Sequence, residues 1–485
     1  MKNRFTPLLL LSCFGILPLQ AETLSWSGAA ADQDFLNPEN WTPAQSFTAA
    51  DTLIVDGANV SAPILLRSDA EFGALLLTNK TQTIALQAEE SARLKISGVL
   101  ASDDKNSLDV ISSSATSGTN QINADIVLSG TRLVRIKSST GTLWLSGNIS
   151  EETEGMSVLH SRNDPSSQRL VTGQNTYSGI TSLNSDTLIV SSLGMTGQPS
   201  AIGRNKQINI GYKGSRTAVL VYIGDGETTD KDFQWGGGSG SSSFQNRSET
   251  GPVEFTGSFL FPYYGTLNLS GSNPGTNIVH CPICNPQNSG GTDAVKLGVN
   301  LTDIDRSAWL FTGDNTHTDT TEINYGTLLL SGDNSAATGV WSVKQNATLG
   351  GTTTLGGSVS LMGTLKPGLP KGEMVITQDL TIGEKGYGTI ACSPDTSLLV
   401  KGVFQISGKW KVDIAEGFQP GGEFVLLEYG SMTASSETYE TPTIKGSIPT
   451  FSDGTAPTVE CTNDGNRLIL TGIHSPVKGS IIFIH

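Results

Sequence analysis

The sequence predicts an all-β protein built from repeated short strands, and three observations lead to this prediction. Residues 171–192 and 311–332 align without a gap at an offset of 140, and nine of 22 positions are identical. Short apolar runs with Thr and Val are punctuated by Gly, Asn and Asp, which is typical of short strands joined by turns. No stretch beyond the first apolar run keeps a period of 3.6 residues. A chain that reuses one strand–turn–strand unit is usually a repeat architecture.

The start of the chain predicts export. Lys2 and Arg4 form a basic region, an apolar run extends over 8–17, and a small alanine closes residues 1–21. This pattern is that of a secretory signal peptide, and the run is too short for a transmembrane span. A lipidation box at LLSC, ending in Cys13, is the alternative, although Leu11 fits such a box poorly. The expected location is the cell surface, the outer membrane or the extracellular space, with no transmembrane segment in the mature chain.

Composition narrows the class of partner. The 485 residues include 56 Gly, only 15% are charged, and the formal net charge is −15. Few charges argue against disorder driven by self-repulsion. An acidic surface repels nucleic acid and anionic lipid, so no nucleic-acid partner is expected. It suits solubility outside the cell, or binding of cations.

The elements follow in order along the chain. Short strands are expected at 53–55, 64–66, 74–77, 126–128, 133–136 and 143–145. The segment GTLWLSG at 141–147 recurs as GTLNLSG at 265–271 and as GTLLLSG at 326–332. Residues 232–251 are rich in Gly and Ser, which predicts an exposed loop or linker. Longer strands are expected within 403–430, and 466–472 is the last strand of the core.

The exported chain retains four cysteines: Cys281, Cys284, Cys392 and Cys461. An oxidising compartment favours disulfides, and a local bridge between Cys281 and Cys284 would fix the turn in HCPICNP. A redox pair and a metal site including His280 are the alternatives. The flanking prolines disfavour the helix start that a redox pair needs. A second bridge between Cys392 and Cys461 stays open, because sequence alone cannot pair them.

The repeated unit resembles the autotransporter-associated β-strand repeat, whose motif contains TG-x-NTY-x-G, then a Thr-rich strand, then a Thr-Leu strand. Tyr177 and Gly179 complete the motif in the first copy, whereas His317 and Asp319 replace them in the second, so that turn could differ. The matching repeat residues are Thr172, Gly173, Asn175, Thr176 and Leu188 in the first copy and Thr312, Gly313, Asn315, Thr316 and Leu328 in the second.

The resemblance implies a right-handed parallel β-helix, a solenoid that stacks equivalent positions of successive coils. It would occupy 22–390, with a C-terminal β-rich segment at 391–485 completing or capping it. Asparagine suits tight corners, so Asn175, Asn184, Asn315 and Asn324 are predicted at corners. Leu188 and Leu328 are predicted to face the stacked core. The family's autotransporters end in a membrane β-barrel. The C-terminal residues do not show the alternating ten-residue strands of such a barrel, so the chain is expected to resemble a secreted passenger.

Candidate chemistry is sparse. No GxSxG, HExxH or complete EF-hand motif is present. The loop DGETTDKD brings Asp225, Glu227, Asp230 and Asp232 close in sequence, which would suit Ca²⁺, although a solvated loop without cofactor is the plainer interpretation. The aromatic segment FPYY at 261–264, which precedes Gly265, could stack on sugar rings, or could belong to the core or a strand end.

Two classes of function stay open. The first is a non-enzymatic surface or secreted protein for adhesion or scaffolding, with an extracellular glycan or another surface protein as partner. The second is a β-helix enzyme acting on polysaccharide, either a lyase or a glycoside hydrolase, which would need clustered acids or bases on one face. Repeat motifs without a distinctive polar cluster favour the first class.

Overall fold

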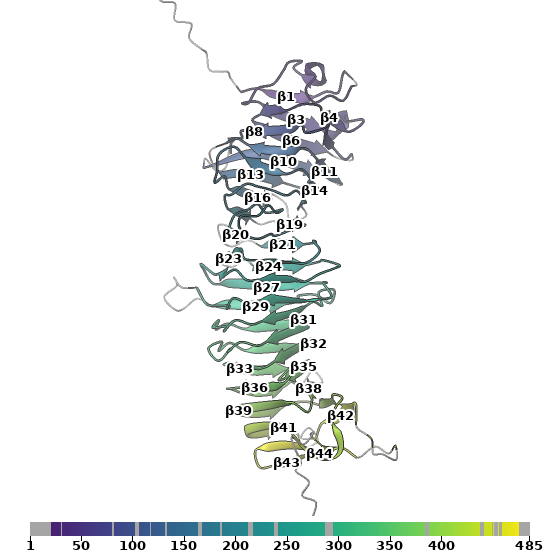
Figure 1. Cartoon of the computed structure of the whole chain (residues 1–485), viewed down its shortest axis with the longest axis vertical. Coiled ribbons are helices and arrows are strands. Elements are labelled where there is room, and N and C mark those ends of the chain that lie inside the picture. The colour runs from purple at the N-terminus through teal and green to yellow at the C-terminus, as the bar shows by residue number, and fades with distance from the viewer. Residues whose placement is uncertain are drawn as a thin grey trace, which may run out of the picture.

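The computed structural model shows an elongated all-β solenoid whose strands stack one above another along the long axis (Figure 1). It describes residues 21–474, apart from 31, 80–81, 102–105, 117, 131–132, 163–166, 185–186, 212–216, 237–240, 287–293, 384–387, 437–440, 449, 451–453 and 455–457. The expected signal peptide therefore lies outside the described residues, except for its last residue.

The coils of the N-terminal half contribute strands to three rows, which we name A, B and C in chain order. Row A contains β1 (Thr23–Trp26), β3 (Thr52–Asp56), β6 (Ala74–Asn79), β10 (Ser107–Ala115), β13 (Leu133–Ser138), β16 (Val158–Arg162), β18 (Thr181–Asn184), β20 (Gln207–Ile210), β23 (Asp232–Trp235) and β26 (Phe259–Leu260). Row B contains β4 (Ile64–Leu66), β7 (Ala85–Ala88), β11 (Thr119–Ile122), β14 (Thr142–Leu145), β17 (Gln168–Val171), β19 (Thr187–Val190), β21 (Ala218–Tyr222), β24 (Ser241–Asn246), β27 (Gly265–Gly271) and β29 (Val295–Val299).

Row C completes each coil. It begins with β5 (Ala70–Phe72), β8 (Arg93–Ile96), β12 (Asp125–Leu128) and β15 (Ile149–Glu151), and resumes with β22 (Glu227–Thr229), β25 (Val253–Phe255), β28 (Thr276–Val279) and β30 (Ala308–Phe311). Two longer strands, β31 (Thr321–Leu330) and β32 (Trp341–Gly351), then serve rows B and C in turn. The first part of β31 pairs with β29 and its last part pairs with β30.

The later coils repeat the scheme with parallel pairing. Their strands are β33 (Thr353–Leu355), β34 (Val359–Leu361), β35 (Thr364–Pro367), β36 (Gly372–Ile376), β37 (Leu380–Ile382), β38 (Gly388–Cys392), β39 (Thr396–Ile406), β40 (Trp410–Ile414), β41 (Gln419–Ala434) and β42 (Thr443–Gly446). The longer strands expected within 403–430 are β39, β40 and β41.

The core lies inside the solenoid because side chains alternate between the inner and outer faces of each strand. In many strands every second residue is buried, as in β3, β12 and β14. Stacking then joins the inward residues of successive coils into ladders. One ladder in row A runs through Leu53, Leu75, Ile111, Ile136, His160, Leu183, Ile210 and Trp235.

Both ends of the solenoid carry antiparallel strands. At the N-terminus, β2 (Trp41–Thr42) pairs antiparallel with β1, and the rings of Trp26 and Trp41 meet edge-on at 5.3 Å. At the C-terminus, β44 (Arg467–His474) pairs antiparallel with both β41 and β43 (Glu460–Asp464). These strands cover edges that would otherwise expose unpaired backbone groups.

Two sequence-based expectations need correction. Residues 232–251 are not simply a loop, because β23 and β24 lie within them and bury Phe233, Trp235 and Phe244. In the aromatic segment at 261–264, Tyr263 and Tyr264 are 61% and 49% exposed, so neither belongs to the core. Among the described residues, no helix is long and apolar enough to span a membrane.

Candidate functional site

The two repeat asparagines make equivalent buried hydrogen bonds. Asn175 Oδ1 accepts a 2.7 Å hydrogen bond from the backbone N–H of Ile149, and Asn315 Oδ1 accepts one of 2.7 Å from Ile283. Both side chains are fully buried. Each amide therefore satisfies a backbone donor of the preceding coil at a corner, where the regular strand ladder is interrupted.

The two repeat glycines allow the corner to approach that coil closely. A Cβ placed on Gly173 would lie 2.1 Å from the carbonyl oxygen of Gly147, and one on Gly313 would lie 2.7 Å from the backbone of Cys281. A side chain at either position would collide with backbone, so only glycine fits there.

The repeat threonines bond to the same preceding coils. The backbone N–H groups of Thr176 and Thr316 donate to the carbonyl oxygens of Ile149 and Ile283, both at 2.9 Å. Thr172 Oγ1 accepts a hydrogen bond of 3.1 Å from an indole N–H, that of Trp144.

Thr312, its counterpart in the second copy, takes part in a polar row on the outer surface. Its Oγ1 lies 2.9 Å from Nδ1 of His280. The other ring nitrogen of His280 lies 2.7 Å from Glu254 Oε1, and this contact helps to hold the pKa of the Glu254 carboxyl below its usual range. Glu254 Oε2 in turn accepts a hydrogen bond of 2.9 Å from Thr228.

The two copies of the repeat lie on different faces of the solenoid. In the first copy, Asn175 follows β17 of row B and bonds to β15 of row C. In the second copy, Asn315 follows β30 of row C, and the chain then enters the part of β31 that belongs to row B. Leu188 accordingly stacks in row B, between Arg169 and Leu220. Leu328 stacks in row C, and both leucines are fully buried.

The other two predicted corner asparagines are placed differently. Asn184 is the last residue of β18 and pairs with Ser161 of the coil before. Asn324 lies inside β31, at the register shift between Ile323 and Tyr325 where the strand passes from row B to row C. Both side chains are partly exposed, unlike those of Asn175 and Asn315.

The predicted disulfide between Cys281 and Cys284 is wrong. The four described cysteines are free thiols, and none lies at disulfide distance from another. Ile283, between the two, bonds through its backbone N–H and C=O to the corner at Asn315. These bonds fix the backbone on both sides of Ile283, and the two thiols are not brought to the separation that a bridge requires.

The second possible bridge, between Cys392 and Cys461, is not formed either. Burial raises the pKa of the Cys392 thiol to about 12 and that of Cys461 to about 11. Both thiols are therefore weak nucleophiles near neutral pH.

The four carboxylates proposed for Ca²⁺ are used in hydrogen bonds to neighbouring segments, and Glu227 and Asp230 share one of these, residues 193–196. Glu227 accepts hydrogen bonds of 2.6 and 2.8 Å from the N–H groups of Leu193 and Gly194. Of the other three, Asp230 accepts from Thr196, Asp225 from Thr250 and Asp232 from Ser258. No group of three or more His, Cys, Asp or Glu within the described residues is placed to hold a metal ion.

Carboxylates and a cation do meet on the outer face of β5 and β8. The ammonium of Lys95 lies 3.2 Å from Glu71 and 2.9 Å from Glu152. Both carboxylates are thus paired with the same cation and partly exposed. The arrangement is a surface ion-pair row, which stabilises a fold only modestly.

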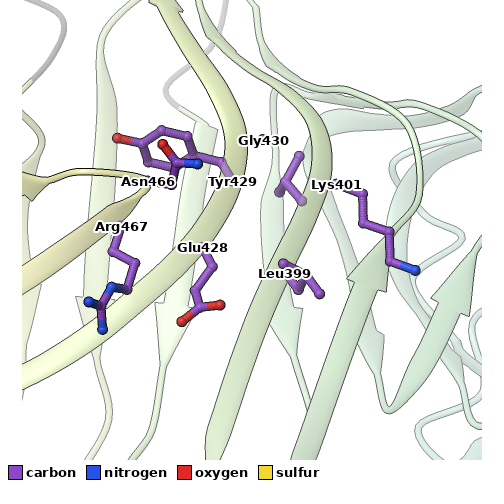
Figure 2. Close-up of a pocket in the computed structure, with 8 residues that line it drawn as sticks. Leu399, Lys401, Glu428, Tyr429, Gly430, Asn466 and Arg467 are labelled. Atoms are coloured by element: carbon purple, nitrogen blue, oxygen red, sulfur yellow. The ribbon is translucent and has the colours of Figure 1, made fainter.

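A cavity of about 340 Å³ lies where β39, β41 and β44 meet at the C-terminal end (Figure 2). Glu428 of β41 and Arg467 of β44 are register partners, and their side chains lie on the same side, whereas Lys401 extends away from them. The two cations therefore do not converge into an anion clamp. The lining residues are Leu399, Val400, Lys401, Glu428, Tyr429, Gly430, Asn466 and Arg467.

One polar cluster was not singled out from the sequence. Gln207 and Asn209 of β20 and Gln234 of β23 join their amides on the outer face of row A. The sequence did indicate which of these side chains face outward, because apolar and polar residues alternate in QINI (207–210) and DFQW (232–235). Alternation places a residue on the outer face, but it does not show which outer residues of different coils meet.

Comparisons with known proteins give one distant relationship. The chain is 26% identical over 225 residues to "Adhesin BmaC autotransporter" of Brucella suis biovar 1 (strain 1330). The match covers 46% of this chain and spans 6% of that adhesin. No family model matches the chain, and no solved structure matches it significantly. Over just under half of its length, the chain is therefore similar to part of an autotransporter adhesin, and it has the strand-rich architecture of a passenger-like protein.

Proposed function

We propose that this chain is an exported, non-enzymatic solenoid that acts at the cell surface or outside the cell in adhesion or extracellular binding. The observation that carries the proposal is the distant similarity to an autotransporter adhesin, which coincides with an all-β solenoid architecture. A solenoid presents extended surfaces whose side chains repeat at the spacing of the coils, which suits binding of long or repetitive partners. The basic and apolar start of the chain supports export.

The partner class we propose is an extracellular glycan or another surface protein. The acidic charge disfavours nucleic acid and anionic lipid as partners. An enzymatic role receives less support, because Glu71 of β5 and Glu152, which follows β15, are both paired with the ammonium of Lys95. A general acid or nucleophilic carboxylate would need a substrate-facing position without such pairing.

Adhesion can be tested with beads coated with residues 22–485. We expect these beads to stay attached under flow to cell layers or to glycan-coated surfaces. Beads coated with the heat-unfolded chain provide the control for nonspecific adsorption. Detachment equal to that control on every surface would contradict the proposal.

The same preparation tests the enzymatic alternative. It should release neither reducing ends nor unsaturated uronates from polysaccharides. Product release at a rate that scales with enzyme concentration would assign the chain to the second class of function instead.

A further inference from the structure

Uncharged polar side chains of successive coils meet on the outer side of row A, where Ser182 and Asn209 are buried and Gln207 and Gln234 are partly exposed. Ser182 of β18, Asn209 of β20 and Gln234 of β23 are register partners in successive coils. Asn209 Nδ2 lies 3.4 Å from Ser182 Oγ, so the row begins with a weak hydrogen bond. Gln207, also on β20, donates from one amide nitrogen to Asn209 Oδ1 at 2.8 Å and to Gln234 Oε1 at 3.1 Å.

These bonds fix the amides but do not use all of their capacity. Among the described residues, Gln234 Nε2 and Gln207 Oε1 have no hydrogen-bond partner, and both side chains are partly exposed. An amide offers two N–H donors and an acceptor with two lone pairs. A donor on one coil and an acceptor on the next are therefore held in place and remain available to a ligand.

The described residues at the two ends of these strands add little net charge. Strand β20 is followed by Gly211 and strand β23 by Gly236, and a Cβ on Gly236 would lie 2.1 Å from the carbonyl oxygen of Gly211. These two glycines themselves place no side chain at that end of the strands. At the other end, the carboxylate of Asp232 lies 3.4 Å from the ammonium of Lys206, so the two charges offset each other.

Apolar and aromatic groups follow at the next coil. Leu260 of β26 is the register partner of Gln234 and is 39% exposed. The chain then continues into the exposed Tyr263 and Tyr264. Exposed aromatic rings offer an apolar surface with a polar tip, which is common where a protein contacts a partly polar ligand.

We propose that the outer face of β20 and β23, with the exposed residues that follow at β26, binds a neutral glycan chain that lies along the solenoid axis. Sugar hydroxyls can donate to Gln207 Oε1 and accept from Gln234 Nε2, while Leu260 and the neighbouring tyrosines face the apolar side of a sugar ring. Coils repeat at about 4.8 Å, close to the length of one sugar residue in an extended chain. The uncharged amides and the paired charges of Lys206 and Asp232 favour a neutral over an acidic glycan.

This inference rests on the proposed role in extracellular binding and names its ligand class. A second explanation is that the amides only stabilise the stack, as polar ladders do in other parallel β structures. The two explanations differ in their consequences. If the amides only stabilise the stack, replacing them with alanine should lower the melting temperature, and the parent itself should not bind a glycan.

The test is calorimetric titration of residues 22–485 with β-1,4-linked hexasaccharides of glucose, mannose and N-acetylglucosamine. An oligogalacturonate of equal length serves as the acidic comparison. We expect at least one neutral hexasaccharide to bind, and the oligogalacturonate to bind more weakly. The double variant Gln207→Ala/Gln234→Ala should weaken binding roughly tenfold, since it removes two ligand hydrogen bonds. Gln245→Ala, on the outer face of row B, is the matched control and should bind like the parent.

Three results would overturn the inference. They are no binding of any neutral hexasaccharide, preference for the acidic one, and unchanged affinity in a double variant that melts like the parent. If the double variant fails to fold, the single variants Gln234→Ala and Tyr263→Ala replace it, and unchanged affinity in both would count against the site. Bead adhesion that persists in the double variant would leave the broader adhesion proposal standing, whereas loss of all adhesion by the parent would remove it.

Discussion

His317 Nε2 lies 2.7 Å from Thr321 Oγ1, and this buried contact reproduces the 2.8 Å bond between Tyr177 OH and Thr181 Oγ1 in the first repeat. The residue four positions on is a threonine in both copies, so two different rings reach an identical partner. The departure of the second copy from the motif therefore leaves the corner unchanged. The second copy does, however, have the imidazole of His317 where the first has the phenol of Tyr177. The phenol is neutral at physiological pH, whereas the imidazole can become charged inside the core.

The first prediction concerns acid sensitivity at this corner. Burial lowers the pKa of His317 from 6.5 to about 4, so the folded state binds fewer protons than the unfolded state between these values. Its contribution to stability is present above pH 6.5 and is lost as the pH falls towards 4, by about 3 kcal/mol at most.

The measurement is urea unfolding at pH 7 and at pH 4.5. His317→Gln, which can still bond Thr321 but does not titrate, should lose less stability on acidification than the parent. Tyr177→His should lose more, because it places a second buried imidazole at the equivalent corner. Equal pH dependence in all three proteins would show that His317 is not held neutral.

The second prediction concerns the corner asparagines. Asn175→Ala or Asn315→Ala should each reduce the free energy of unfolding by about 2–4 kcal/mol, because each leaves a buried N–H group without its acceptor. Asn184→Ala and Asn324→Ala are matched controls from the same repeats with partly exposed side chains. Thermal unfolding of the four variants should separate the two pairs, and a uniform response would argue against the corner bonds.

The third prediction concerns the leucines of the repeat. Leu188→Ala and Leu328→Ala should each cost about 2–5 kcal/mol, because both side chains are fully buried in stacked rows. Ser182→Ala, on the outer side of β18, should change the melting temperature little, since the hydrogen bond that Ser182 accepts from Asn209 is weak at 3.4 Å. Parent-like melting of both leucine variants would contradict the stacking in rows B and C.

The fourth prediction concerns a buried lysine between two coils. Lys231 is fully buried and donates to the carbonyl oxygens of Gly203 and Asn205. Burial lowers its pKa from 10.5 to about 8, so folding favours the neutral amine. Stability from this group should therefore rise as the pH increases from 8 to 10.5.

Other lysines and tyrosines titrate in this range, so the test compares the parent with Lys231→Met by denaturant unfolding at pH 8 and pH 10. The variant should be less stable at both values, because two carbonyl groups lose their donor, and its stability should rise less with pH. A steeper rise in the variant would reverse the assignment.

The fifth prediction concerns thiol chemistry. Cys392 is 4% exposed and its pKa is raised to about 12, so iodoacetamide at neutral pH should label it only when the chain unfolds. Mass spectrometry of the native and unfolded protein measures this. Adding a reductant should not shift the melting temperature, and a reductant-dependent shift would indicate a disulfide.

The sequence by itself determined the all-β class and the placement of most short strands. The alternation of apolar side chains fixes which residues face inward, and strands expected at 53–55, 64–66 and 143–145 are β3, β4 and β14. In 232–251 the prediction relied on the Gly and Ser content, which suggested a loop, and not on this alternation. Phe233, Trp235 and Phe244 are in fact buried in the core there. Local composition was a weaker guide there than the spacing of the aromatic residues.

Only the tertiary structure decided which face each unit occupies and which distant side chains meet. The repeat asparagines make equivalent bonds in both copies, yet Leu188 stacks in row B and Leu328 in row C. Stacking likewise joins Gln207 to Gln234 across two coils. Identical local sequences specify a corner, but the partner of each outward side chain depends on the register accumulated over all preceding coils.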